Sequence, residues 1–198
     1  DLQHKVFVFP QETPDSYVLV RAKPERPLQN FTVCLWSYTD LTRPHSLFSY
    51  ATEAQDNDIL LFKPNPSEYR FYVGGKFVTF RVPESVASGE HVCVTWESAT
   101  GIVGFWLNGE PWPRKGLQRG YAVAAEAAIV LGQDQDTFGG GFDAHQSFVG
   151  EMSSVYMWDE GITTAAVRGA MSHSLYKAPI FGWRNFPHSV VGEVFLKP

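Results

Sequence analysis

The sequence predicts an all-β sandwich that occupies residues 1–198 as a single domain. Short segments rich in Val, Phe, Tyr and Thr recur at fairly even spacing, as β-strands do. Clusters of Gly, Pro, Asn and Asp separate these segments, and no helical segments alternate with them, which excludes a βαβ architecture. Sandwiches of this length are commonly undivided, and no linker in the sequence is long enough to separate two domains.

In the first half of the chain, each expected strand is a run of β-branched, aromatic or aliphatic residues. Each run ends at a turn signal, as at Pro24, Pro27 and the Gly74-Gly75 pair. The expected strands are residues 6–9, 17–20, 31–38, 47–50, 59–62, 69–73 and 77–82.

The second half of the chain continues this pattern. Asn108-Gly109 directly follows an apolar run, and this dipeptide predicts a tight hairpin. Residues 122–130 are rich in Ala, which favours a helix, but the stretch is short for an independent one, and we interpret its second half as a strand. The expected strands are residues 91–97, 103–107, 129–132, 155–158 and 194–196.

One short helix is expected over residues 163–171. Thr163 is suited to cap its amino end, and alanines follow within the segment. Trp36, Trp96, Trp106 and Trp158 lie in strand-like segments, and we expect them in the core; Trp112, in a turn between two prolines, could serve an oligomer contact.

The charge balance excludes one class of function. The 21 Asp and Glu residues exceed the 16 Lys and Arg residues, which gives a net charge of −5 at pH 7, and no block of like charge occurs. A specific nucleic-acid site is therefore not expected. No apolar run has the length of a membrane span, and no signal-peptide pattern precedes the first strand, so we expect a soluble protein from which any signal peptide has been removed.

The cysteines and one glycosylation motif indicate the compartment. The spacing of Cys34 and Cys93 excludes a CxxC redox or zinc motif, which leaves either a disulfide or two free thiols. Asn30-Phe31-Thr32 is an N-glycosylation motif. Together these features favour a secreted, extracellular glycoprotein, with Asn30 as the glycosylated residue.

The segment 132–146 is rich in oxygen ligands. It contains three carboxylates and several amides around a glycine turn. In an extended backbone, Asp134 and Asp136 point the same way, and the Gln135 carbonyl can turn toward the same ion. Such donors suit calcium, although the spacing is not that of an EF-hand. From the residues alone, a solvated acidic hairpin remains the alternative for this segment. The earlier segment Gln55-Asp56-Asn57-Asp58 by itself predicts a turn.

No pattern for catalysis is present, and we expect no catalytic residues. The sequence lacks the strand arrangement of paired carboxylates that a sugar-cleaving enzyme of this architecture requires. It also lacks HExxH and Gly-x-Ser-x-Gly motifs. The expectation is a binding protein.

The segment His91–Ser98 indicates which kind of binding protein. It matches the pentraxin signature His-x-Cys-x-(Ser/Thr)-Trp-x-(Ser/Thr) at every fixed position. The resemblance extends over nearly the whole chain and is weakest over residues 160–187. It implies a flattened, lectin-like jelly-roll sandwich, a disulfide between Cys34 and Cys93, and a cyclic homo-oligomer, by family default a pentamer. It also implies a secreted calcium-dependent pattern-recognition protein of innate immunity, of acute-phase type, with complement components as possible partners.

The resemblance further implies two calcium ions on each subunit. The first-site pattern is matched by Asp56, Asn57, Asp134, Asp136 and the Gln135 carbonyl. The second is matched by Asp134, Asp136, Asp143 and Gln146. The family usually has glutamate at position 134, and aspartate shortens the carboxylate that is expected to bridge both ions.

In the family, these ions hold the phosphate of phosphocholine or phosphoethanolamine, and neighbouring side chains select the amine. Those side chains are here Leu60, Phe62, Tyr72 and Phe77. Phe77 stands where one member of the family has an acidic residue, so we expect the amine to be held by aromatic contacts. Phosphoethanolamine should then bind at least as well as phosphocholine. A calcium-dependent, lectin-like binder of glycans or anionic polysaccharides is the alternative function.

Overall fold

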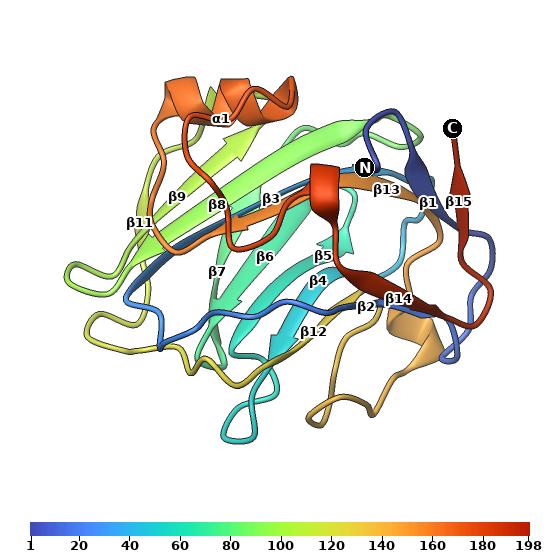
Figure 1. Ribbon diagram of the computed structural model, residues 1–198, viewed down its shortest axis with the longest axis horizontal. Helices are drawn as coiled ribbons and strands as arrows, with labels where there is room; N and C mark the ends of the chain where they lie inside the picture. The colour runs from blue at the N-terminus through green and yellow to red at the C-terminus, as the bar shows by residue number, and fades with distance from the viewer.

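The computed structural model describes residues 1–198 and consists of two antiparallel sheets packed face to face (Figure 1). The strands are β1 (Val6–Phe9), β2 (Tyr17–Val20), β3 (Asn30–Tyr38), β4 (His45–Ala51), β5 (Ile59–Asn65), β6 (Glu68–Val73), β7 (Lys76–Arg81), β8 (Glu90–Glu97), β9 (Ile102–Leu107), β10 (Glu110–Pro111), β11 (Lys115–Gly116), β12 (Ala128–Leu131), β13 (Gly150–Trp158), β14 (His188–Val191) and β15 (Phe195–Lys197). The helical elements are α1 (Thr164–Met171) and the 3-10 turns η1 (Ala144–Gln146) and η2 (Trp183–Asn185).

The two sheets differ in which strands they join. The eight-stranded sheet has the order β10-β9-β8-β3-β13-β1-β15, and β11 also pairs with β9. The seven-stranded sheet has the order β14-β2-β12-β4-β5-β6-β7. Strands distant in sequence thus lie side by side in both sheets, and the predicted all-β sandwich with one short helix is confirmed.

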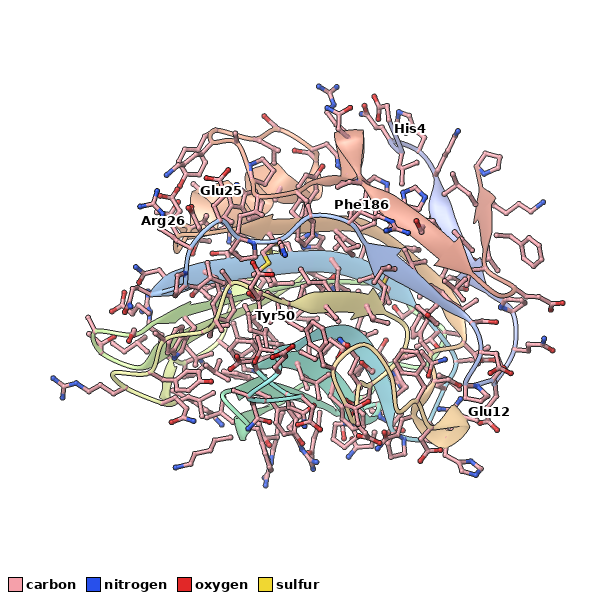
Figure 2. All side chains as sticks on the ribbon, turned by 60° about the horizontal axis from the view of Figure 1, so that its bottom comes forward. His4, Glu12, Glu25, Arg26, Tyr50 and Phe186 are labelled. Carbon is pink, nitrogen blue, oxygen red and sulfur yellow. A yellow bond between two sulfur atoms is a disulfide. The ribbon has the colours of Figure 1, made fainter.

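The core lies between the sheets and contains one cluster of 45 buried residues. Its members alternate along the strands: in β6, Tyr69, Phe71 and Val73 face the core. Figure 2 shows side chains filling the space between the layers, including Tyr50, whose hydroxyl donates to the Ala124 carbonyl at 2.6 Å.

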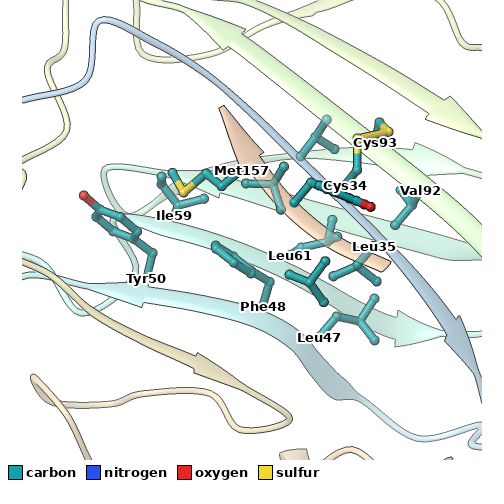
Figure 3. Packing of buried hydrophobic residues seen from close by; sticks show 14 of the residues in the cluster. Cys34, Leu35, Leu47, Phe48, Tyr50, Ile59, Leu61, Val92, Cys93 and Met157 are labelled. Carbon is teal, nitrogen blue, oxygen red and sulfur yellow. A yellow bond between two sulfur atoms is a disulfide. The ribbon is translucent and has the colours of Figure 1, made fainter. Parts of the chain in front are cut away.

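A disulfide crosslinks two neighbouring strands of the eight-stranded sheet. Cys34 in β3 and Cys93 in β8 are directly opposed in the register, and both are fully buried (Figure 3). Their sulfur atoms are bonded, so the implied Cys34–Cys93 pairing is confirmed and neither cysteine is free.

The helix lies over β8 and β9, on the face of the eight-stranded sheet that points away from the core (Figure 1). The Thr163 hydroxyl accepts a hydrogen bond from the Ala166 amide at 3.2 Å, as expected for the cap. Val167 and Ala170 supply its buried side. No helix of this structure has the length and apolar character that crossing a bilayer requires.

Several strand predictions were wrong at their ends. β13 begins at Gly150 and not at Val155. The earlier start was missed because a register shift between Ser153 and Tyr156 interrupts the alternation of buried and exposed residues. Ser154, inside that shift, has a φ of 56°. Strand β14 and the short strands β10 and β11 were not expected. The hairpin predicted at Asn108-Gly109 is confirmed, because both residues have positive φ, as a type I′ turn requires.

The tryptophans divide into two groups. Trp96, Trp106 and Trp158 are buried, as expected for core residues. Trp36 is only half-buried, which differs from the prediction. Trp112 is also half-buried; it packs on Phe105 and donates its indole N–H to the Arg81 carbonyl at 2.9 Å, so its position is already explained within the chain.

Candidate metal centre

The seven-stranded sheet has one face on the core and one directed away from it, which we call the outer face. In β6, the residues between the core positions, Arg70 and Tyr72 among them, belong to the outer face. Two loops meet near one end of this sheet: residues 52–58, before β5, and residues 132–143, after β12. Figure 1 shows both at the lower edge of the molecule, and the carboxylates of the two loops interact electrostatically.

The first loop is held by a buried carboxylate. Asp58 accepts hydrogen bonds from the Thr52 hydroxyl at 3.0 Å and the Tyr121 hydroxyl at 2.5 Å. The backbone carbonyls of Asn57 and Asp58 accept from the amides of Gly75 and Gly74, at 2.9 and 3.0 Å. The loop is thereby fastened to the turn between β6 and β7, and Asp56 and Asn57 are positioned beside the outer face.

Gly75 is required in this arrangement. Its φ is 80°, and a Cβ at this position would lie 2.5 Å from the Gln55 side-chain nitrogen. The Gln55 side-chain oxygen in turn accepts from the Asn57 amide at 3.1 Å. Any side chain at position 75 would therefore disturb the loop that presents Asn57.

The second loop folds around the Gln135 side chain. Its amide nitrogen donates to the carbonyls of Ala128 and Ser49, at 2.8 and 3.2 Å, and its oxygen accepts from the Gly139 amide at 2.8 Å. The side chain is fully buried and has a structural role. The Gln135 backbone carbonyl accepts no hydrogen bond in the structure, so it is available to a metal ion, in keeping with the expectation that this carbonyl is the ligand.

The 3-10 turn η1 positions the remaining candidate ligands. Asp143 caps η1 by accepting from the His145 amide at 2.9 Å, and its own carbonyl accepts from the Gln146 amide at 2.9 Å. Asp143 is exposed and Gln146 is half-buried. All seven residues expected to bind calcium therefore come from two loops and one adjoining turn.

Three buried oxygen atoms in these segments lack a hydrogen-bond partner: Asn57 Oδ1, Asp134 Oδ1 and Gln146 Oε1. Buried polar groups are nearly always paired, so orphaned acceptors require an explanation. Gln133 Oε1 is a fourth such atom in the same loop, but its amide is anchored elsewhere, to Thr13 and Ser16. The three acceptors all belong to residues expected to bind calcium, and a cation would satisfy them.

The electrostatics of the cluster also favour a cation. Burial and the nearby carboxylates of Asp136 and Asp56 raise the pKa of Asp134 to about 7. Burial and the carboxylates of Asp56 and Asp143 raise the pKa of Asp136. None of these four aspartates takes part in a salt bridge. The like charges are therefore not neutralised by the chain itself.

The donor set fits a hard cation better than a transition metal. No three His, Cys, Asp or Glu side chains converge closely enough to hold a metal by themselves. Amide and backbone carbonyl oxygens must complete the coordination, and oxygen-only sets of this kind are typical of calcium. The residues present thus fit calcium.

The four residues expected to contact the head group lie on the same outer face. Leu60, Tyr72 and Phe77 are paired in register across β5, β6 and β7. Leu60 and Phe62 are almost completely buried, Tyr72 is half-buried and Phe77 is 47% exposed. The rings of Tyr72 and Phe77 lie 4.9 Å apart between centroids, and neither residue belongs to the core cluster.

Sequence reasoning missed Arg70. It pairs with Phe62 in the register, and its guanidinium carbon lies 4.6 Å from the centroid of the Phe77 ring. The signal was present in the sequence, because Arg70 and Tyr72 are two positions apart in one strand and must share a face. Asp58 was also missed: it was interpreted as part of a turn and is the buried anchor of the first loop.

Asn30, in the predicted glycosylation motif, is the first residue of β3 and is exposed. Its side chain is therefore accessible to a glycan.

Comparison with known proteins is consistent along the whole chain. The sequence model of the Pentaxin family matches residues 5–198. Serum amyloid P-component of Cavia porcellus is 47% identical over 198 residues, covering 100% of this chain and 89% of that protein. C-reactive protein of Homo sapiens is 46% identical over 200 residues, with the same coverage.

Two further relatives add detail. Mucosal pentraxin of Rattus norvegicus is 55% identical over 162 residues, covering 82% of this chain and 74% of that protein. Among solved structures, a native heptameric SAP-like pentraxin from Limulus polyphemus superposes with a TM-score of 0.85. It covers 99% of this chain and 95% of its own at 23% identity, so the match concerns the fold alone.

Proposed function

Because this chain belongs to the pentraxin family, we propose that it is a calcium-dependent pattern-recognition protein that binds ligands of the phosphocholine or phosphoethanolamine type. Pentraxins such as serum amyloid P-component and C-reactive protein are recognition proteins and not enzymes, and the same is true of this chain. Innate immune recognition is the context that this implies.

One observation carries the proposal: three buried, unpartnered oxygens occur beside aspartates whose charges are not neutralised. In our proposal two calcium ions bind to each subunit, and Asp134 and Asp136 contact both. Asp56, Asn57 and the Gln135 carbonyl complete one site, and Asp143 and Gln146 complete the other. When bound, the calcium supplies the positive charge that holds a phosphate.

The rest of the ligand extends over the outer face. Leu60 and Phe62 form its apolar base, and Tyr72 and Phe77 flank it. The fastening of the first loop to Gly74 and Gly75 supports this arrangement, because it joins the candidate calcium ligands to the hairpin that bears Tyr72 and Phe77.

The homologues also guide the proposals on assembly and location. Serum amyloid P-component and C-reactive protein are secreted serum proteins, and a SAP-like pentraxin from Limulus polyphemus is heptameric. We propose that this chain is likewise secreted, glycosylated at Asn30 and assembled into a ring, with a pentamer as the first expectation and complement components as candidate partners. The single hydrophobic cluster supports a single domain over residues 1–198.

Calcium titration calorimetry tests the metal site. We expect Asp136→Asn to lower both the affinity and the amount of calcium bound, because one carboxylate would be lost from both ions. Asp40→Asn is the matched control, because Asp40 is also exposed and lies outside the cluster. Unchanged calcium binding in Asp136→Asn would mean that the second loop is only a solvated acidic hairpin.

Ligand binding requires a separate experiment. Phosphocholine, phosphoethanolamine and a panel of simple sugars are titrated into the protein with calcium or with a chelator. We expect binding of the two phosphate esters that the chelator abolishes. Calcium-dependent binding of sugars alone would replace the proposal with the glycan-binding alternative.

A further inference from the structure

We propose that Arg70 selects the part of the ligand that extends away from calcium, and that it favours an anion at this position over an ammonium group. The inference rests on the proposed function, because it concerns the second group of a ligand whose phosphate is held by calcium. Among the phosphate monoesters that calcium can hold, it favours one that carries a carboxylate over an amino-alcohol phosphate.

Arg70 lies on the outer face of the seven-stranded sheet. The core residues of β6 are Tyr69, Phe71 and Val73, so Arg70 projects on the outer face, as Tyr72 does. In the register, Arg70 lies opposite Phe62, one of the four residues expected to contact the head group. Arg70 therefore belongs to the same surface as the expected amine pocket.

The Arg70 guanidinium occupies a ring that the ligand amine was expected to contact. Its carbon lies 4.6 Å from the centre of Phe77, which is a cation–π distance. A ligand ammonium that approached this ring face would meet a positive charge already stacked there. Where one family member has an acidic side chain, this pocket therefore presents the Arg70 guanidinium stacked on the Phe77 ring. It does not present a cage of free aromatic rings.

Arg70 has no counter-ion in the protein. It makes no salt bridge, and its side chain takes part in no hydrogen bond with the protein. Its Nε is buried without a partner, although the side chain as a whole is half-buried. Guanidinium groups bind carboxylates and phosphates through two parallel hydrogen bonds, so an unpaired one on a binding surface favours an anionic ligand.

The distance between the second loop and Arg70 sets the length of ligand that can contact both. The Gln135 side chain binds Ser49, and Ser49 pairs with Leu60, which pairs with Tyr72. Two strand spacings therefore separate the second loop from β6, about 10 Å of sheet. Arg70 lies two residues before Tyr72 in β6, but its guanidinium lies over Phe77, the register partner of Tyr72. A small ligand with two anionic groups on a short spacer can therefore contact calcium and Arg70 together.

The test compares two ligands that differ only in the second group. Phosphocholine is compared with the phosphate monoester of 3-hydroxypropanoate, which replaces the trimethylammonium by a carboxylate on the same two-carbon spacer. Calorimetry in saturating calcium should show at least tenfold tighter binding of the carboxylate ligand to the wild type. Arg70→Gln should abolish that preference. Arg70→Lys should retain part of it, since lysine keeps the positive charge but lacks the two parallel N–H donors of the guanidinium.

Arg81→Gln is the matched control, because Arg81 is an exposed arginine on the outer face of the neighbouring strand β7. It should leave the preference unchanged. Calcium affinity should be the same in Arg70→Gln as in the wild type, which verifies that the variant is folded. An equal ratio of the two affinities in wild type and Arg70→Gln, or a wild-type preference for phosphocholine, would overturn the inference.

A chelator separates this inference from the function on which it rests. If both ligands need calcium and Arg70→Gln changes nothing, Arg70 has no selective role and the calcium-dependent function stands. If Arg70→Gln removes the preference but chelation leaves binding intact, the anion contact stands and the calcium-dependent function fails.

Discussion

Two regions of the molecule contain buried charged side chains and differ in how completely their charge is paired. Lys63 in β5 and Glu90 in β8 form a salt bridge of 3.0 Å between the two sheets, and both side chains are almost completely buried. The Tyr69 hydroxyl donates to the same carboxylate oxygen at 2.6 Å, and the Lys63 ammonium lies over the Tyr69 ring. In the aspartate cluster, by contrast, like charges adjoin and acceptors lack donors.

This difference shows what each group of charges is for. A buried ion pair whose groups are satisfied holds the two sheets in one arrangement and needs no ligand. Buried carboxylates without counter-charge are costly in the protein alone, and a cation removes that cost. Incomplete pairing therefore marks the place where a bound ion stabilises the fold.

The largest effect is expected at the paired site. Glu90→Ala should lower the free energy of unfolding by about 3–5 kcal/mol, because it leaves the Lys63 ammonium buried without a partner. Urea unfolding in the presence of calcium measures this change.

A double variant controls for the loss of the pair itself. Lys63→Met with Glu90→Leu should be close to neutral, since apolar residues of similar volume can replace a buried ion pair. If the double variant were as unstable as Glu90→Ala, the contribution of this region would come from packing and not from charge.

At the unpaired site the sign of the effect should depend on calcium. Asp134→Asn should stabilise the calcium-free protein, because it removes a buried charge next to Asp136 and Asp56. In calcium at one hundred times the wild-type dissociation constant, the same variant should lose most of the roughly 2.7 kcal/mol that binding contributes. Thermal unfolding with and without chelator measures both signs, and destabilisation in chelator would contradict the comparison.

Calcium affinity should also depend on pH. The pKa of Asp134 is about 7 in the folded protein, against 3.8 as its ordinary value, so the carboxyl group is half protonated at neutral pH. Calcium must displace that proton, and affinity should fall about tenfold between pH 8 and pH 6, since one proton competes with the ion. Without calcium, the same shift means that stability falls as pH rises from about 4 to 7.

Calorimetry in two buffers of different ionisation enthalpy detects the proton that calcium releases at pH 7. The free energy of unfolding is a poorer measure of Asp134 ionisation, because two histidines also titrate. Burial lowers the pKa of His45 and His91 to about 4, so their contribution to stability is lost as pH falls below 6.5, opposite in direction to that of Asp134. Asp134→Asn should release no proton. Equal heats in the two buffers for the wild type would show that Asp134 is already ionised.

The smallest effect is expected at the exposed edge of the cluster. Asp143→Asn should weaken calcium binding only a few-fold and leave the unfolding free energy of the calcium-free protein unchanged, because asparagine also caps helical turns. Asp143→Ala should additionally cost about 1 kcal/mol, because the hydrogen bond to His145 is lost. Equal unfolding free energies for the two variants would show that this cap does not contribute to stability.

The sequence was sufficient for most of the strands and for the helix cap at Thr163, because period-two alternation and capping residues act locally. It was not sufficient at residues 150–154, where Ser154 in a positive-φ conformation shifts the register between Ser153 and Tyr156. Strand β14 was missed as well, because its Ser and His residues interrupt the apolar pattern at the edge of the sheet.

For the candidate site, the residue types and the family signature predicted which loops meet. They could not predict that the Gln135 side chain hydrogen-bonds within the protein and stabilises its own loop. Nor could they predict that Asp58 is buried and hydrogen-bonded to Tyr121, 63 positions away. The stacking of Arg70 on Phe77 depends equally on cross-strand register, which no local pattern specifies.

The edges of the sandwich have a consequence for biosynthesis. Strands β14 and β15, at residues 188–197, form an edge of each sheet, and β15 pairs with β1. Val6 is thus opposite Lys197, so β1 can complete its pairing only after β15, much later in the chain, has been synthesised. Contacts between such distant residues slow folding, and an unpaired strand edge invites association with other chains. Until residues 195–197 have been synthesised, β1 therefore has one open edge at which it can associate with other chains.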